Sequence, residues 1–117
     1  MAIEKKEFDA AAEAAKNAKS TYTLVFKKPV VYGEKTYTAL NFDFEKLTGA
    51  DGLNIEAELQ ALGKAVIVPT LSGEYLMRMA AKACDQPIGA DFFNAVSLAE
   101  YNKIRSAARS FLLASES

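Results

Sequence analysis

Residues 22–44 alternate apolar and polar side chains at every second position, and helical periodicity begins only beyond them. Six of the twelve Phe and Tyr residues of the chain lie in this stretch, among Thr and Val, which strands favour. A repeat of two residues is typical of a half-buried strand. Because strand and helix patterns occupy separate parts of the chain, the sequence predicts an α+β fold. We expect an antiparallel β-hairpin at 21–44, followed by a small bundle of three to four helices.

The expected hairpin turns at Tyr32-Gly33-Glu34-Lys35. Glycine at the first central position suits a type II′ turn, because the backbone φ angle must be positive there. A regular ladder from this turn would oppose apolar and polar residues, such as Phe26 and Asn41. We therefore expect one extra residue at Lys28-Pro29 on the first strand, where proline lacks a ladder donor. The predicted pairs are Phe26 with Leu40, Leu24 with Phe42, and Tyr22 with Phe44.

Start signals and apolar spacing predict four helical segments after the hairpin, at about 51–63, 73–85, 90–96 and 98–113. Thr48 or Asp51 caps the first segment, and Ser72 opens the second, which is apolar around most of its girth and therefore central or in an interface. Ser97 and Glu100 have the spacing of a capping box. The stripes expected to face the core are Ile55, Leu59 and Leu62 in the first helix and Leu98, Tyr101, Ile104, Ala108, Phe111 and Leu112 in the last.

The two ends of the chain differ in character from its middle. Residues 1–20 are rich in Ala and charge but hold few large apolar groups, which predicts a polar helical arm. Residues 21–114 then form a single α+β domain, and 115–117 a short tail. Residues 65–68 suit either a third strand or an extended linker. We expect no membrane span, because charged and polar residues interrupt the apolar region 65–84, and no secretory leader.

Composition argues against several classes of function. With 14 basic and 15 acidic residues the net charge is -1, whereas nucleic-acid-binding domains usually carry a basic patch. The chain contains no histidine, so histidine-dependent hydrolase triads and zinc sites are excluded. Cys84 is the only cysteine and can form no internal disulfide, which favours the cytoplasm. We expect no enzyme activity, cofactor or metal.

Three local patterns have both a functional and a structural interpretation. Gly49-Ala50-Asp51-Gly52 matches the GxxG loop of KH domains, but a turn with a helix cap is favoured because Asp51 replaces a basic residue. Asp43, Glu45 and Asp51 lack the alternating spacing of a calcium loop, so a solvated strand end is favoured. Cys84 has no histidine to lower its pKa, and we expect an inert core thiol.

Taken in order, several short motifs of the chain resemble one protein family. They run over about 21–113 and comprise Tyr22-Thr23-Leu24, Lys28-Pro29-Val30, Gly33-Glu34-Lys35-Thr36-Tyr37-Thr38, Leu40, Asp43-Phe44, Leu47-Thr48-Gly49-Ala50-Asp51, Tyr101-Asn102 and Ala108-Arg109-Ser110-Phe111-Leu112. This order is similar to that of the tail assembly chaperones of long-tailed bacteriophages.

The resemblance implies a small viral protein of a phage or prophage, without catalytic residues. Family members coat the long, hydrophobic tape measure protein, keep it soluble, recruit tail tube protein and leave before the virion is complete. Their location is the host bacterial cytoplasm during tail assembly, and they are absent from the mature virion. Oligomerisation would join weak binding sites into an array of high effective concentration. The alternative function is a small nucleic-acid-binding or regulatory module that uses the hairpin and the GxxG turn.

A client-binding surface is predicted from the supply of apolar side chains. The helices between 73 and 112 carry more apolar area than one hairpin and one helix can easily cover, although such stripes are core in most proteins of this size. Methionine suits a variable client, because its unbranched side chain repacks readily. The residues expected to bind protein are Met77, Phe92, Phe93, Phe111 and Leu113.

Overall fold

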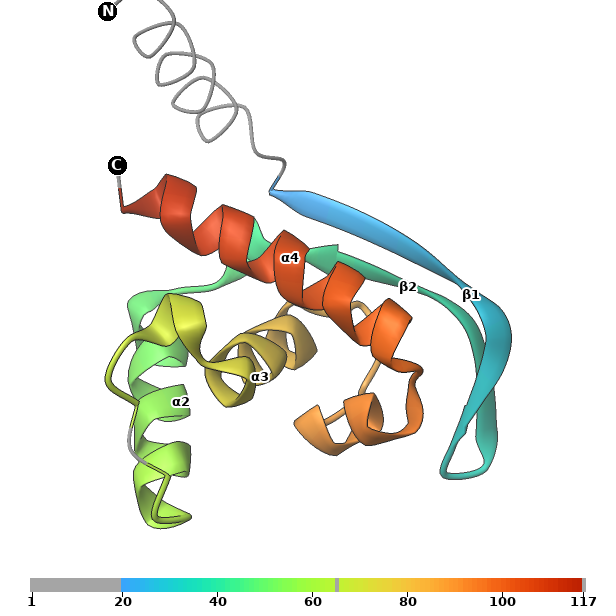
Figure 1. The fold of residues 1–117 in the computed structure, drawn as a ribbon, viewed down its shortest axis with the longest axis horizontal. Coiled ribbons are helices and arrows are strands. Elements are labelled where there is room, and N and C mark those ends of the chain that lie inside the picture. Colours follow the sequence, from blue (N-terminus) through green and yellow to red (C-terminus); the bar gives the residue numbers. More distant parts are fainter. Residues whose placement is uncertain (1–19, 65, 117) are drawn as a thin grey trace, which may run out of the picture.

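The structure is a computed structural model that describes residues 20–64 and 66–116. It is α+β as predicted: a two-stranded antiparallel hairpin precedes the helices, which pack together against its concave side (Figure 1). The elements are β1 Thr21–Tyr32, β2 Lys35–Asp43, the 3-10 turn η1 Phe44–Lys46, α2 Gly49–Ala61, η2 Pro69–Leu71, α3 Gly73–Ala83, η3 Ala90–Ala95 and α4 Leu98–Ser115. The predicted arm lies outside the described residues except for Ser20.

The hairpin turn is of the predicted kind. Gly33 has a φ of 63°, and no non-glycine residue of the described chain has a positive φ. A positive φ at the first central position alone is the signature of a type II′ turn. Tyr32 and Lys35 pair on either side of it. The turn therefore starts the ladder where the sequence predicted.

The register change in β1 is larger than predicted. Val30 pairs with Tyr37 and Val25 pairs with Ala39, so four residues of β1, 26–29, oppose Thr38 alone. The first strand thus holds three extra residues rather than one, and the predicted pairs are wrong: Leu24 pairs with Leu40 and Tyr22 with Phe42.

The buried face of the hairpin is nevertheless the predicted one. A register shift of one residue and a register shift of three residues are both odd. Both therefore place the same alternate side chains of β1 on the buried face. The residues buried on this face are Leu24, Phe26, Val30, Tyr37, Leu40 and Phe42. Phe92 of η3 lies against it, with ring centroids 6.1, 5.3 and 5.4 Å from those of Phe26, Tyr32 and Tyr37.

Helix α2 begins at the predicted cap but buries fewer residues than expected. Thr48 and Asp51 form a full capping box, in which the Asp51 amide donates to the Thr48 hydroxyl and the Asp51 carboxylate accepts from the Thr48 amide. Ile55 and Leu59 are buried. Leu62 is 58% exposed, contrary to the prediction. The helix ends at Ala61, so Leu62 no longer lies on the helix face that carries Ile55 and Leu59.

Helix α3 is the centre of the core, as its apolar girth predicted. Ser72 caps it by accepting from the amide of Tyr75 at 3.1 Å. The helix contacts α2, α4, all three 3-10 turns and β2. Residues 66–68 form an extended linker rather than a strand, with Ile67 91% exposed. Among the described residues, no helix combines the length and apolar character needed to span a membrane.

Helix α4 departs from its prediction at its first turn. Ser97 caps it by accepting from the amide of Glu100 at 3.2 Å. The Glu100 side chain does not complete the capping box; it is buried and accepts from the backbone amide of Lys27 in the β1 bulge instead. Leu98 was expected in the core but is 73% exposed, whereas Ile104 and Ala108 of the same stripe are fully buried. The stripe thus meets the core only from the second turn onward.

Candidate functional site

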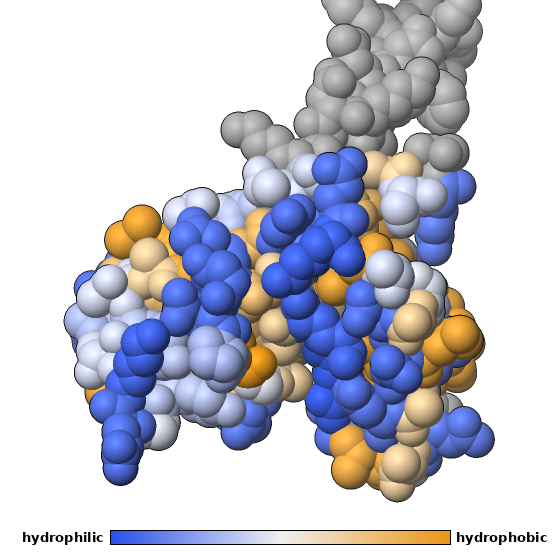
Figure 2. Space-filling view, turned by 180° about the vertical axis from the view of Figure 1, so that it is seen from behind, coloured by the Kyte–Doolittle hydropathy of each residue, from blue (hydrophilic) through white to orange (hydrophobic). Residues whose placement is uncertain are grey.

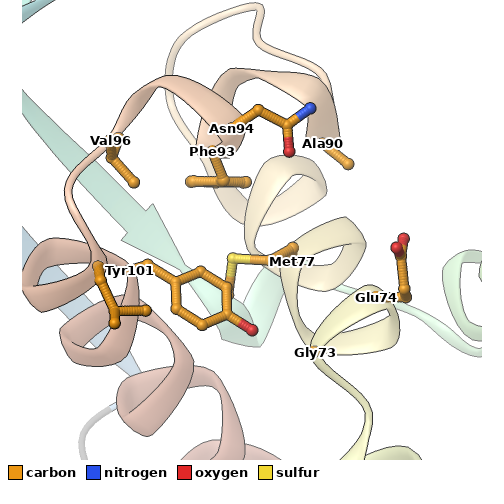
Figure 3. A pocket seen from close by; sticks show the side chains of 9 residues that line it. Gly73, Glu74, Met77, Ala90, Phe93, Asn94, Val96 and Tyr101 are labelled. Carbon is orange, nitrogen blue, oxygen red and sulfur yellow. The ribbon is translucent and has the colours of Figure 1, made fainter.

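A groove of about 540 Å³ lies between η3 and the first turns of α3 and α4. We call it the α3–α4 groove. Figure 3 shows that the side chains of Met77 and Tyr101 extend toward this space from α3 and α4, and that Phe93 faces it from η3. Glu74, Asn94 and Leu98 also line it.

Local sequence signals position two of the three elements that line the groove, α3 and α4. Ser72 and Ser97 cap the starts of α3 and α4, and residues from the first turns of both helices line the groove. Gly73 lies so close to Tyr101 that a Cβ atom at this position would overlap the tyrosine hydroxyl. Glycine at the start of α3 therefore leaves room for the end of the Tyr101 side chain at this end of the groove.

The floor of the groove is apolar and its rim is mixed. Met77 and Phe93 are buried, Tyr101 is half-buried, and Leu98 stands out at the rim. The one carboxylate of the lining, Glu74, is held by Lys64 at 3.0 Å and by Arg78 at 3.8 Å. An apolar side chain entering here would replace water on the floor and cover Leu98. The arrangement suits the binding of an apolar group.

The five residues predicted to bind protein do not form one surface. Met77, Phe92 and Phe93 are 6%, 0% and 5% exposed, so their expected place on the surface is wrong. The sequence analysis counted the two phenylalanines of η3 as surplus apolar surface, whereas they are buried between the hairpin and α3. Only Met77 and Phe93 border the groove.

Phe111 and Leu113 lie near the other end of α4. Phe111 is half-buried and stacks on Phe44 with centroids 5.6 Å apart, whereas Leu113 is 43% exposed. At 1.5 Å per residue, Leu113 lies about 22 Å along the helix from Leu98. Sequence reasoning missed Leu98 because its spacing matches the buried stripe. Leu98 differs from the buried residues of the stripe in its position: it directly follows the cap Ser97, before α4 reaches the core.

The other candidate sites have structural roles. Gly49-Ala50-Asp51-Gly52 forms the first turn of α2, and Asp43 caps η1 by accepting from the Glu45 amide at 3.2 Å. Within the described residues, no group of three or more His, Cys, Asp or Glu side chains is arranged to hold a metal ion. Cys84 is buried, and burial raises the pKa of its thiol, which disfavours the reactive thiolate.

Apolar side chains on the surface are dispersed. Figure 2 shows several separate apolar patches on one face of the molecule, with hydrophilic residues between them. Elsewhere Val25 and Val31 of β1 are exposed on the side of the hairpin that faces away from the helices. No protein-family model matches the chain, and no curated protein or solved structure matches it. Function is therefore inferred from the groove, the surface and the sequence motifs.

Proposed function

We propose that this chain is a non-enzymatic tail assembly chaperone of a phage or prophage, which keeps the tape measure protein soluble and assists tail tube assembly. The observation that carries the proposal is the α3–α4 groove, with its apolar floor and the exposed Leu98 at its rim. The sequence motifs of the hairpin, of the α2 cap and of α4 support the same family.

The groove fits the apolar face of a client helix. Such a helix binds by placing a few apolar side chains, spaced three or four residues apart, into a complementary channel. A volume of about 540 Å³ accommodates one or two large side chains, which act as anchors. Met77 on the floor adapts to different anchors because its side chain is flexible.

A single anchor binds weakly, so the proposed chaperone acts as a homo-oligomer. Several grooves along one tape measure protein would raise the effective concentration of each site. The exposed valines of β1, Val25 and Val31, are candidates for contacts between copies because they are 68% and 66% exposed on a strand face that no helix covers. The tail tube protein is the second proposed partner.

Co-expression with the tape measure protein of the same phage tests the proposal. Leu98→Glu places a charge at the groove rim, and its exposure means that the fold should be unaffected. Leu53→Glu is the matched control, because Leu53 is 69% exposed but belongs to α2. We expect the wild type and Leu53→Glu to keep the client soluble and co-purify with it, whereas Leu98→Glu loses both properties.

Two results would contradict this function. A client that stays soluble with Leu98→Glu would show that the groove is not its site. A client that precipitates with the wild type would argue against a chaperone altogether. If the chain instead binds nucleic acid with an affinity that falls steeply as salt rises, the alternative binding module is correct.

A further inference from the structure

The outer edge of β1 carries backbone groups that point away from β2. The Phe44 amide donates to the Ser20 carbonyl at 2.8 Å, and this pair continues the register of the ladder at 21–25. Hydrogen-bonded and non-hydrogen-bonded pairs alternate along an antiparallel ladder. The next residue after Ser20 and every second one from there therefore direct their amides and carbonyls outward. These residues are Thr21, Thr23 and Val25.

The opposite edge of the hairpin, on β2, is already covered. Asn41 pairs with Thr23, so its amide and carbonyl also point away from the other strand. Both groups are bound by Asp85: the Asn41 amide donates to the Asp85 carboxylate at 3.4 Å, and the Asp85 amide donates to the Asn41 carbonyl at 3.0 Å. The segment after α3 thus occupies the place of a further strand beside β2.

The edge of β1 has no such cover. Among the described residues, none donates to or accepts from the outward backbone groups of Thr21, Thr23 and Val25. All three residues are exposed, and Figure 1 shows β1 along the outer margin of the hairpin. The open stretch ends at the bulge, where the Lys27 amide is bound by the Glu100 carboxylate at 3.3 Å.

The sequence of this open stretch lacks the usual protection of an edge strand. Natural proteins guard exposed edges with charged residues, proline or bulges, because unpaired backbone groups invite another chain. Residues 20–26 contain neither a charged residue nor proline. All three protective features occur directly beyond them, at Lys27-Lys28-Pro29 in the bulge. Pairing is therefore blocked beyond the stretch and left free within it.

We propose that residues 21–25 of β1 pair antiparallel with the same residues of a second copy, around a two-fold axis at Thr23. The outward residues lie symmetrically on either side of Thr23. Thr23 would face Thr23 of the second copy, and Thr21 would face Val25, each in a hydrogen-bonded pair. Moving the axis by one residue would leave one of the three outward residues outside the paired stretch.

The side chains of the stretch suit this self-pairing. On the exposed face, Thr21 would lie opposite Val25 of the second copy, and two β-branched side chains pack well across strands. On the helix side, Tyr22 would lie opposite Leu24. Tyr22 is half-buried and stacks on Phe42 with centroids 6.3 Å apart, so the second copy would cover its remaining exposed surface. No like charges meet within the paired stretch.

The result is a closed pair rather than an extended fibre. The two hairpins would form one four-stranded sheet, in which each outer edge is a β2 strand covered by Asp85. A two-fold interface uses the same surface on both copies and leaves none free to continue. For its biological role this dimer rests on the proposed chaperone function, in which it would bring two α3–α4 grooves together.

Measurements on the full chain without any client test the pairing. Sedimentation velocity should show a monomer–dimer equilibrium that depends on concentration. Hydrogen exchange at the amides of Thr21, Thr23 and Val25 should slow as the concentration rises. A chain that stays monomeric at NMR concentrations would overturn the proposal. Slow exchange that does not depend on concentration would show that the edge is covered within one chain, which would also overturn it.

Charge variants test the position of the two-fold axis. Thr23→Lys places two like charges opposite each other and should raise the dimer dissociation constant about tenfold or more. Thr36→Lys is the control, because it adds the same charge at an exposed residue of β2 and should leave the dimer unchanged. Mixing Thr23→Lys with Thr23→Glu should restore a mixed dimer, which a misfolded variant could not form.

Two outcomes of this series would contradict the axis, and neither involves the client. A Thr23→Lys protein that dimerises as tightly as wild type would place the interface elsewhere. Failure of the two variants to recover a dimer on mixing would show that the residues do not face each other. The client assay with Leu98→Glu tests the groove separately, so a failed dimer and a failed chaperone are distinguishable.

Discussion

At the scale of single residues, acidic side chains join the hairpin to the helical part, and two of them accept from backbone amides of the strands. Glu100 reaches the bulge of β1, and Asp85 reaches the open edge of β2. The Asp85 carboxylate accepts from the backbone amide of Asn41 at 3.4 Å and from its side-chain amide at 3.2 Å, and the Asp85 amide donates to the Asn41 carbonyl at 3.0 Å. This small sheet edge is thereby covered by the segment after α3.

The Asp85 contact makes stability depend on pH in a defined direction. The Asn41 side-chain amide, as the main cause, lowers the pKa of Asp85 from its ordinary value of 3.8. Stabilisation by the carboxylate is therefore complete above about pH 4 and is lost as the pH falls through the lower folded-state pKa. Urea unfolding of wild type and Asp85→Asn should differ at pH 7, and the difference should shrink below pH 3.8. A difference that stays constant down to about pH 2 would contradict this role.

Gly73 gives a second residue-scale prediction. A methyl group at this position overlaps the Tyr101 hydroxyl, so Gly73→Ala should displace the ring and cost about 1 kcal/mol or more of unfolding free energy. In a Tyr101→Phe background the overlapping oxygen is absent, and the same substitution should cost close to nothing. Chemical denaturation of the four proteins of this double-mutant cycle measures the coupling. Equal costs in both backgrounds would mean that the two residues do not meet.

At the scale of elements, the sequence predicted the type and order of structure well. Hairpin, turn and helix starts each have a local chemical signal: alternation at 22–44, Gly33, and the caps Thr48, Ser72 and Ser97. The size of the bulge has no such local signal in the sequence, because register shifts of one and of three residues bury the same face of the hairpin. Its cause is tertiary, since the Lys27 amide in the bulge is bound by Glu100, 73 residues away. Burial of Phe92 and exposure of Leu98 likewise depend on how η3 and α4 dock.

The face of β1 is tested by two neighbouring residues. Phe26 is 7% exposed and packs near Phe92, whereas Val25 is 68% exposed on the opposite side. Phe26→Ala should lower the free energy of unfolding by about 3–5 kcal/mol through the lost contacts and the cavity created. Val25→Ala should stay within about 0.5 kcal/mol of wild type. The reverse order in denaturant titrations would mean that the register is slipped by one residue.

At the scale of the whole molecule, the helices and the hairpin enclose one aromatic core, and two cavities flank Val96 at the start of α4. The sequence predicted more apolar side chains than the core could cover, but the structure buries most of them. Among the described residues, Leu98 and eight other large apolar side chains stay exposed. Figure 2 shows separate apolar patches on one face of the molecule. This distribution fits weak individual sites that require an array, which is consistent with the proposed oligomeric chaperone.

The most direct test of the proposed function is methyl NMR of the methionines during titration with a soluble helical fragment of the tape measure protein. Met77 lines the α3–α4 groove, whereas Met79 is buried on the same helix and does not line it. The two methyl groups therefore provide a reporter and an internal control. We predict a saturable shift of the Met77 methyl signal with little change at Met79, and loss of that shift in Leu98→Glu. A fragment that binds while leaving the Met77 signal unchanged would contradict the assignment of the groove as the client site.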